Sequence, residues 1–319
     1  MPDTFIGVDV SQDYLDVHVR PAAVRRRFAN SVAGIAELVD WVRPHAATRI
    51  VFESTGPYQK AAVGALLAEG LPAVVVNARQ VRDFAKALNY LAKTDTLDAA
   101  VIAHFAEVAT TTVRPLESQE IRDLREWYDR RGQLVRMLAV EKNQRHAATV
   151  ATASPKVLQS IEKHIDYLER QIHDLEERMD RIIESSAAFQ ARDEILQTIT
   201  GIGPQVSRTL LAYLPELGRY SRQAIAALVG LAPFNDDSGT HTGQRHIRGG
   251  RSKVRVGLYQ AAIAALRHCP HMKAFYAGLK ARGKASRVAI IAVARKLLVL
   301  ANALIRDMVP YRAPANSVC

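Results

Sequence analysis

The chain has 319 residues, 48% of them hydrophobic and 24% charged, which is the composition of a soluble globular protein large enough for two domains. Apolar runs such as residues 288–293 are much shorter than the roughly 18 residues that span a bilayer, the first residues lack a signal-peptide pattern, and two cysteines cannot build a disulfide framework. The net charge of +11 is concentrated in residues 195–319, which carry 18 Lys and Arg against four acids, so a polyanion is the expected partner. We therefore expect a cytoplasmic protein, nucleoid-associated in a bacterium, with no membrane partner.

The first part of the chain alternates between strand-like and helix-like patterns. Apolar or alternating segments predict strands at residues 4–10, 14–20, 26–29, 49–53 and 71–77. Helical patterns follow residue 30, run from residue 56 to 69, and continue from the last strand to about residue 108. Three successive strands followed by strand–helix–strand–helix predict an α/β domain with a mixed sheet over residues 1–110.

The middle of the chain is expected to be helical from about residue 118 to 186, with a break near residues 153–155. In its second half, apolar residues alternate at spacings of four and three over three heptads: Ile161, Ile165, Leu168, Ile172, Leu175, Met179 and Ile182. This pattern predicts a coiled-coil hairpin or a dimer stalk. Residues 111–192 are therefore interpreted as a helical and coiled-coil linker.

The last part is expected to be an all-α domain over residues 193–319. Residues 201–204, Gly-Ile-Gly-Pro, open a helix in the manner of a helix-hairpin-helix turn, although plain helix punctuation explains them equally well. A loop rich in glycine and aspartate covers residues 234–250, and helices resume from about residue 251 to 308.

Four carboxylates are candidates for chemistry. Asp9 interrupts an apolar strand, where an unpaired charge is costly, and Glu53 ends another apolar strand. Asp95 and Asp98 are three residues apart at a helix start, which places both on one face. Together the four could hold Mg²⁺ ions. The alternatives are helix capping by Asp95 and Asp98 and a solvated Glu53, whereas nearby acids at positions 13 and 16 fit a turn and an exposed strand position.

The motifs around these carboxylates resemble those of one family. They are Gly7-Val8-Asp9-Val10-Ser11, Phe52-Glu53-Ser54-Thr55-Gly56, Lys93-Thr94-Asp95-Thr96-Leu97-Asp98-Ala99, Gly201-Ile202-Gly203-Pro204, Leu228-Val229-Gly230-Leu231-Ala232-Pro233 and Asp237-Ser238-Gly239. The chain resembles the DEDD-type, Piv-invertase-like insertion-sequence transposases, which are described as bridge-RNA-guided recombinases. The resemblance covers nearly the whole chain in the family's order.

The resemblance implies a fold and a reaction. The N-terminal domain would be RNase H-like, specifically RuvC-like, with Asp9, Glu53, Asp95 and Asp98 as its Mg²⁺ ligands. Ser238 would be the nucleophile that attacks a DNA phosphodiester, and the ester would conserve the energy needed for rejoining. His241 and His246 are rivals to the metal as activators of this serine. A structured guide RNA would choose donor and target DNA, and the working unit would be a homodimer or homotetramer.

A basic segment follows the candidate serine. Within residues 244–255 five side chains are cationic and are predicted to contact nucleic-acid phosphates: Arg245, Arg248, Arg251, Lys253 and Arg255.

Two other functions remain open at this stage. A metal-only nuclease, such as a junction resolvase, would use the four carboxylates and leave Ser238 incidental. A nucleic-acid-binding scaffold would use the basic C-terminal domain and none of the acids.

Overall fold

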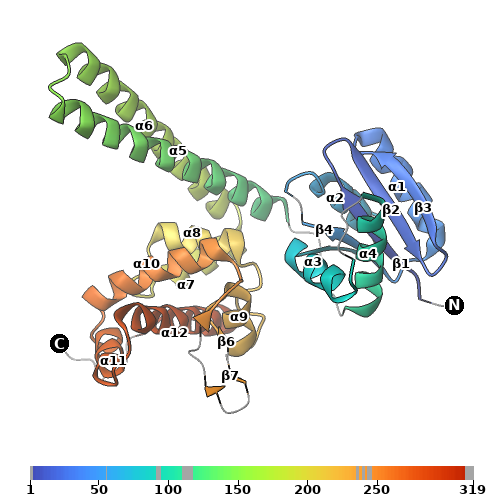
Figure 1. Ribbon diagram of the computed structural model, residues 1–319. Coiled ribbons are helices and arrows are strands. Elements are labelled where there is room, and N and C mark those ends of the chain that lie inside the picture. Colours follow the sequence, from blue (N-terminus) through green and yellow to red (C-terminus); the bar gives the residue numbers. More distant parts are fainter. Residues whose placement is uncertain are drawn as a thin grey trace. The chain divides into compact units, whose positions relative to one another are not determined.

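The computed structural model describes residues 3–54, 56–90, 95–109, 118–234, 237–238, 241–242 and 246–312, with side chains described except at 95–97, 237–238 and 241–242. The chain divides into two compact units, Met1–Glu117 and Ser118–Cys319, each with its own core (Figure 1). By these contacts the middle helices belong with the C-terminal unit. The three-part division predicted from the sequence, with boundaries at residues 110 and 192, stays a prediction.

Unit 1 is an α/β domain built on a five-stranded mixed sheet. Its strand order is β3-β2-β1-β4-β5, with β1, β2 and β3 antiparallel and β1, β4 and β5 parallel. The elements are β1 (Phe5–Val10), β2 (Tyr14–Arg20), β3 (Val24–Ala29), α1 (Val32–Val42), η1 (Arg43–His45), β4 (Arg49–Glu53), α2 (Lys60–Ala68), β5 (Ala73–Val76), α3 (Ala78–Ala87) and α4 (Asp95–Val108). The predicted α/β class with a mixed sheet is confirmed.

The sheet is covered on both faces, as its apolar strands require. Alternate residues of β1 and β4, such as Val8 and Phe52, pack with α1 and α2 in one core cluster. The intervening residues, such as Phe5 and Val51, pack with α3 and α4 in another. Figure 1 shows α3 and α4 in front of the sheet in this view. The face under α4 is the one that carries the candidate carboxylates.

Unit 2 begins with a long helical hairpin. Helices α5 (Gln119–Val150) and α6 (Pro155–Glu184) pack side by side (Figure 1), and heptad residues Leu168 and Leu175 form a cluster with Leu134 of α5. An ion pair joins Lys142 to Glu169 at 2.7 Å across the two helices. Four of the seven heptad residues are buried within this one chain, and the other three, Ile161, Ile172 and Ile182, are half-buried.

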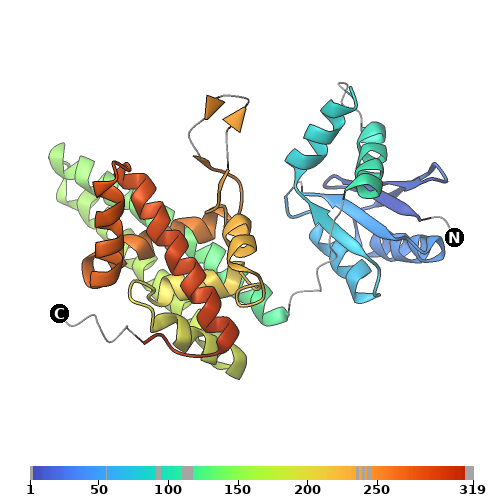
Figure 2. The same cartoon turned by 90° about the horizontal axis from the view of Figure 1, so that it is seen from below.

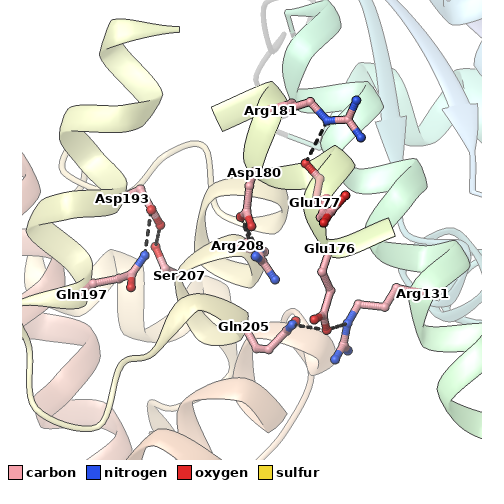
Figure 3. Close-up of polar contacts among 10 residues, drawn as sticks. All are labelled: Arg131, Glu176, Glu177, Asp180, Arg181, Asp193, Gln197, Gln205, Ser207 and Arg208. Carbon is pink, nitrogen blue, oxygen red and sulfur yellow. Dashed lines mark hydrogen bonds and ion pairs between the residues drawn. The ribbon is translucent and has the colours of Figure 1, made fainter. Parts of the chain in front are cut away.

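Polar contacts anchor this hairpin to the C-terminal helices (Figure 3). Glu176 of α6 accepts from both Arg131 of α5 and Gln205 of α8 (Pro204–Tyr213), each at 2.6 Å. Arg208 of α8, whose side chain is only 6% exposed, is held by Asp180 of α6 at 2.5 Å. These contacts join α5, α6 and α8, and removing Asp180 would leave the largely buried charge of Arg208 without its partner.

The rest of unit 2 is a helical core with one segment of short paired strands. Its elements are α7 (Ala187–Gln197), α8 (Pro204–Tyr213), α9 (Arg222–Val229), β6 (Pro233–Phe234), β7 (Asp237–Ser238), β8 (His241–Thr242), β9 (His246–Ile247), α10 (Ser252–His268), α11 (Pro270–Ala281) and α12 (Ser286–Asp307). One prediction needs correction here. The stretch 234–250 contains short antiparallel strands, β6 with β9 and β7 with β8, where only a loop was expected. The Gly-Ile-Gly-Pro turn has a packing role, because a Cβ at Gly201 would lie 2.5 Å from the carbonyl oxygen of Ala261.

Helix α12 is apolar throughout much of its length. In the described part of the chain it is the one helix long and apolar enough to cross a membrane by length and composition. The search of the sequence for uninterrupted apolar segments did not find this helix, because Arg295 and Lys296 divide its apolar sequence. Residues at every fourth position from Ala289 to Ile305 are buried in the core of unit 2, as in a core helix.

Candidate functional site

Two of the candidate carboxylates lie at the carboxyl ends of neighbouring parallel strands. β1 and β4 pair as far as Val8 and Phe52, so Asp9 and Glu53 occupy the next position on each strand. Neighbouring strands are about 4.8 Å apart, and residues at one level of a parallel pair point to the same face. Both residues are half-buried. The structure therefore brings Asp9 and Glu53 side by side.

Helix α4 packs on that same face and runs antiparallel to β1. Gly7 permits this contact, because a Cβ there would lie 2.2 Å from the amide nitrogen of Ala103 and 2.3 Å from the carbonyl oxygen of Ala99. At the other end, Arg49 at the start of β4 donates to the carbonyl oxygen of Ala109 at 2.8 Å. The amino end of α4 therefore lies toward the carboxyl ends of β1 and β4.

The remaining two candidate acids lie in the first turn of α4. Asp95 is the first residue of the helix, and Asp98 is half-buried directly before Ala99, the residue in contact with Gly7. The backbone thus directs all four candidate positions to one edge of the sheet. The side chain of Asp95 lies outside the described residues.

This donor set has the chemistry of a site for hard cations. Carboxylate oxygens at one half-buried edge are the ligands that Mg²⁺ takes in proteins. Asp9, Glu53 and Asp98 each have polar or electrostatic contacts in the structure. Among the side chains described, which exclude that of Asp95, no three acids, histidines or cysteines lie close enough together to hold a metal ion.

Sequence reasoning missed another carboxylate in the same row. Asp16 of β2 pairs in register with Asp9 on one side and with Arg27 of β3 on the other. Arg27 donates two hydrogen bonds to it, at 2.8 and 2.9 Å, and the Asp16 side chain is only 23% exposed. The bidentate guanidinium compensates this charge. Only the strand register reveals that Asp16 adjoins the candidate site.

A buried histidine lies beside Gly7, two residues before Asp9 along β1. His18 of β2 pairs in register with Gly7, and Arg25 donates from Nε to its Nδ1 at 3.1 Å. Burial, followed by the charges of Arg25 and Arg20, lowers the pKa of His18. A neutral imidazole therefore borders the contact between α4 and the sheet.

The candidate nucleophile lies on a short hairpin in unit 2. Ser238 ends β7 and pairs in register with His241 of β8. His246 lies on β9 at the base of the hairpin, opposite Phe234 of β6. In Figure 2 the strands β7 and β8 (orange) lie beyond this base, away from the helical core. Of the two rival activators, the backbone places His241 closer to the serine.

Three of the five predicted phosphate contacts are engaged within the protein. Arg251 binds Glu216 through two hydrogen bonds of 2.5 Å and donates to the carbonyl oxygen of Tyr213 at 2.7 Å. Lys253 pairs with Asp129. Arg255 donates to the carbonyl oxygens of Gly249 and Val229, which fixes the segment between β9 and α10.

The other two predicted contacts differ from these. Arg248 is exposed and its guanidinium lies 5.1 Å from the ring centre of Phe234. Arg245 lies outside the described residues. The exposed cation nearest in sequence to the candidate serine, within the described residues, is therefore Arg248.

A tyrosine links the basic segment to the helical hairpin of α5 and α6. The Tyr213 hydroxyl bonds to Asp129 of α5 and accepts from Lys253 at 3.0 Å. Burial, followed by the hydrogen bond and charge of Asp129, raises the pKa of Tyr213 well above its usual range. Tyr213 therefore stays protonated and acts as a fixed donor between α5 and α10.

Comparison with known proteins places the chain in a family. Residues 6–152 match a model of DEDD-type IS110 transposases, described as "Transposase", and residues 193–277 match one described as "Transposase IS116/IS110/IS902 family". The pilin gene-inverting proteins of Moraxella lacunata and Moraxella bovis are each 25% identical over 98% of both chains. The insertion element IS110 uncharacterized 43.6 kDa protein of Streptomyces coelicolor is 26% identical over 46% of this chain and 37% of its own length. The two family matches together cover most of the chain and confirm the sequence resemblance. The chain therefore belongs to the DEDD-type, Piv-like insertion-sequence transposases, which are DNA-recombining enzymes.

Proposed function

We propose that this transposase cuts and rejoins DNA through a covalent bond to Ser238, with Mg²⁺ held by Asp9, Glu53, Asp95 and Asp98. The observation that carries the proposal is the placement of Asp9 and Glu53 side by side, on the face where α4 begins. The strand order β3-β2-β1-β4-β5 supports the RuvC-like assignment of unit 1.

The reaction conserves the broken bond's energy. The Oγ of Ser238 forms a bond to the phosphorus, and the bond from phosphorus to the 3′ oxygen breaks. The hydroxyl proton goes to a base, for which His241 is the candidate by register, and the departing 3′ oxygen gains a proton. Attack by a new 3′ hydroxyl reverses these steps and releases Ser238, so rejoining needs no ATP.

The carboxylates have a positioning role in this scheme. When bound, Mg²⁺ would polarise the phosphate and neutralise charge that develops on its oxygens. Asp9 and Glu53 are on rigid strands, and Asp98 is on a helix seated against Gly7, so the ligand spacing is fixed by the fold.

Guidance and assembly are part of the proposal. By family resemblance, a structured RNA encoded beside the element selects donor and target DNA. The unit at work is a homodimer or homotetramer, in which the carboxylates and Ser238 meet within one chain or across protomers. The pilin gene-inverting relatives are named for inverting a DNA segment, which is also a cut-and-rejoin reaction.

The test is a search for the covalent intermediate. Purified protein is incubated with Mg²⁺, the RNA transcribed beside its gene and DNA spanning the element's junction, and products are separated on denaturing gels. We expect a DNA-linked protein band in the wild type that vanishes in Ser238→Ala, in Asp9→Asn, and when Mg²⁺ or RNA is omitted. Asp13→Asn, an exposed turn acid on the same strand connection, is the matched control and should keep the band.

Each alternative has its own signature in this assay. Equal cleavage by wild type and Ser238→Ala, with no adduct in either, would leave a metal-only nuclease. DNA binding without cleavage in any variant would leave a scaffold.

A further inference from the structure

Unit 2 contains an open cleft beside the base of the serine hairpin. Its volume is about 650 Å³, within the range of roughly 300–1,000 Å³ typical of ligand sites. Helices α10 and α12, which lie side by side, form its walls. Pro233 of β6 and His246 and Ile247 of β9 form the end nearest the hairpin.

The lining combines an apolar interior with a cationic rim. Val256 of α10 and Val288 of α12 line the cleft and remain 61% and 54% exposed, so their apolar side chains are open to an occupant of the cleft. Tyr259 lines it from α10 and adds an aromatic ring. Such a surface suits a flat, partly apolar group such as a nucleobase.

The rim carries arginines and no acid among the lining residues. Arg255 is fixed by the carbonyl oxygens of Val229 and Gly249. Arg287 and Arg295 of α12 have no hydrogen bond or ion pair within the described residues. They are eight positions apart, so they lie about 12 Å apart along the helix. Two available guanidinium groups on the wall of an apolar cleft favour an occupant with phosphates at its edge.

We propose that this cleft holds an unpaired nucleotide of the DNA strand, next to the phosphodiester that Ser238 attacks. The base would enter between Tyr259 and Val288, and the flanking phosphates would bind Arg287 and Arg295. The inference rests on the proposed function. Residues of β6 and β9, the strands at the base of the hairpin that carries Ser238, line the cleft, and for this reason we choose DNA over RNA as its occupant.

The first test measures binding in the presence of EDTA, so that no strand is cut. Fluorescence anisotropy gives the Kd of the full-length protein for a short labelled DNA single strand across a range of salt. For Arg287→Ala/Arg295→Ala we expect an affinity loss of about tenfold, and a salt slope lower by about 1.4, since each single-strand phosphate contact contributes about 0.7. Arg282→Ala/Lys284→Ala is the matched control, because it removes two exposed cations outside the cleft lining.

The second test asks whether a base enters the cleft. A duplex with one unpaired 2-aminopurine reports stacking through quenching of its fluorescence on binding. Quenching should be lost in Tyr259→Leu and in Val288→Glu, which places a carboxylate in the mouth. Val150→Glu, at an exposed position of α5, is the control and should retain it. Because Val288 is exposed, its variant keeps the test valid if Tyr259→Leu fails to fold.

The outcomes separate this inference from the function on which it rests. Unchanged DNA binding and quenching in the cleft variants, with a normal covalent adduct in the wild type, would overturn the cleft assignment alone. Tighter binding of an RNA strand of the same sequence, with the arginine effect confined to RNA, would also overturn it. Loss of binding in the cleft variants with no adduct in any protein would retain the cleft and reject serine recombination.

Discussion

At the scale of single residues, Gly7 has the most direct effect on the candidate metal site. It is the residue of β1 at which helix α4 contacts the strand, and each of these two elements carries a candidate acid, Asp9 on β1 and Asp98 on α4. Its missing side chain lets the helix backbone approach the strand closely, since two backbone atoms of α4 lie within 2.3 Å of where a Cβ would be. The distance between the acids on the two elements therefore depends on this glycine.

We predict that Gly7→Ala displaces α4 and disables the enzyme. Backbone atoms cannot rotate away, so the overlap with Ala99 and Ala103 must move the helix, at a cost of about 1–3 kcal/mol in the free energy of unfolding. Urea unfolding measures this cost, and the adduct assay should show a loss beyond the unfolded fraction. Gly64→Ala is the control, because nothing lies within 4 Å of its Cβ in helix α2. Equal stability and activity of the two variants would contradict the close approach.

At the scale of elements, the sequence predicted those with strong periodicity. Strands β1, β2 and β4 are continuous or alternating apolar segments, and the structure has them within a residue of the predicted limits. The break between α5 and α6 falls beside Pro155, as predicted. Two-residue strands such as β7 have no periodicity from which to predict them. Their pairing, β6 with β9 and β7 with β8, is given only by the backbone register of the folded chain.

The sequence was enough to select the candidate acids, but it did not show which residues lie next to them in the fold. Asp9 and Glu53 stand out because each interrupts or ends an apolar strand. The relation of Asp16 to Asp9 depends on the β1–β2 register, which a sequence pattern does not give. In the same way, Arg251 looks like one of several phosphate contacts until its partner Glu216, 35 residues earlier, is placed beside it.

The basic segment therefore contains two kinds of arginine, and substitution should separate them. We predict that Arg251→Gln lowers the free energy of unfolding by about 3 kcal/mol, because Glu216, only 14% exposed, loses its compensating charge. Arg248→Gln should leave stability unchanged and lower the salt slope of duplex DNA binding by about 0.9, the contribution of one phosphate contact. Urea unfolding and anisotropy titrations measure the two quantities.

A second substitution checks the reason for the stability loss. Glu216→Gln combined with Arg251→Gln should be more stable than Arg251→Gln alone, since the buried carboxylate that Arg251 compensated is then replaced by a neutral amide. An Arg251 variant of normal stability and weakened DNA binding would instead return this residue to the phosphate contacts.

At the scale of the whole molecule, charge and chemistry are divided between the two units. Residues 1–117 carry a net charge of −1 and all four candidate metal ligands, whereas residues 118–319 carry +12 and Ser238. Within unit 2 the helical hairpin is close to neutral, so the positive charge belongs to the helical core around the serine hairpin. Association with a phosphate backbone depends on such charge, and so DNA affinity should reside in unit 2.

We predict that residues 118–319, produced alone, fold and bind DNA with most of the salt slope of the full chain but form no adduct. The unit has its own apolar core, and both partners of its ion pairs Arg131–Glu176, Arg208–Asp180 and Arg251–Glu216 lie within residues 118–319. Residues 1–117 should fold separately and bind DNA weakly, because net negative charge opposes a polyanion. Circular dichroism and anisotropy on both fragments make the measurement. If residues 1–117 carried most of the affinity, the charge argument would fail. If residues 118–319 alone formed the adduct, Ser238 would not need the carboxylates, and the composite metal–serine site would have to be abandoned.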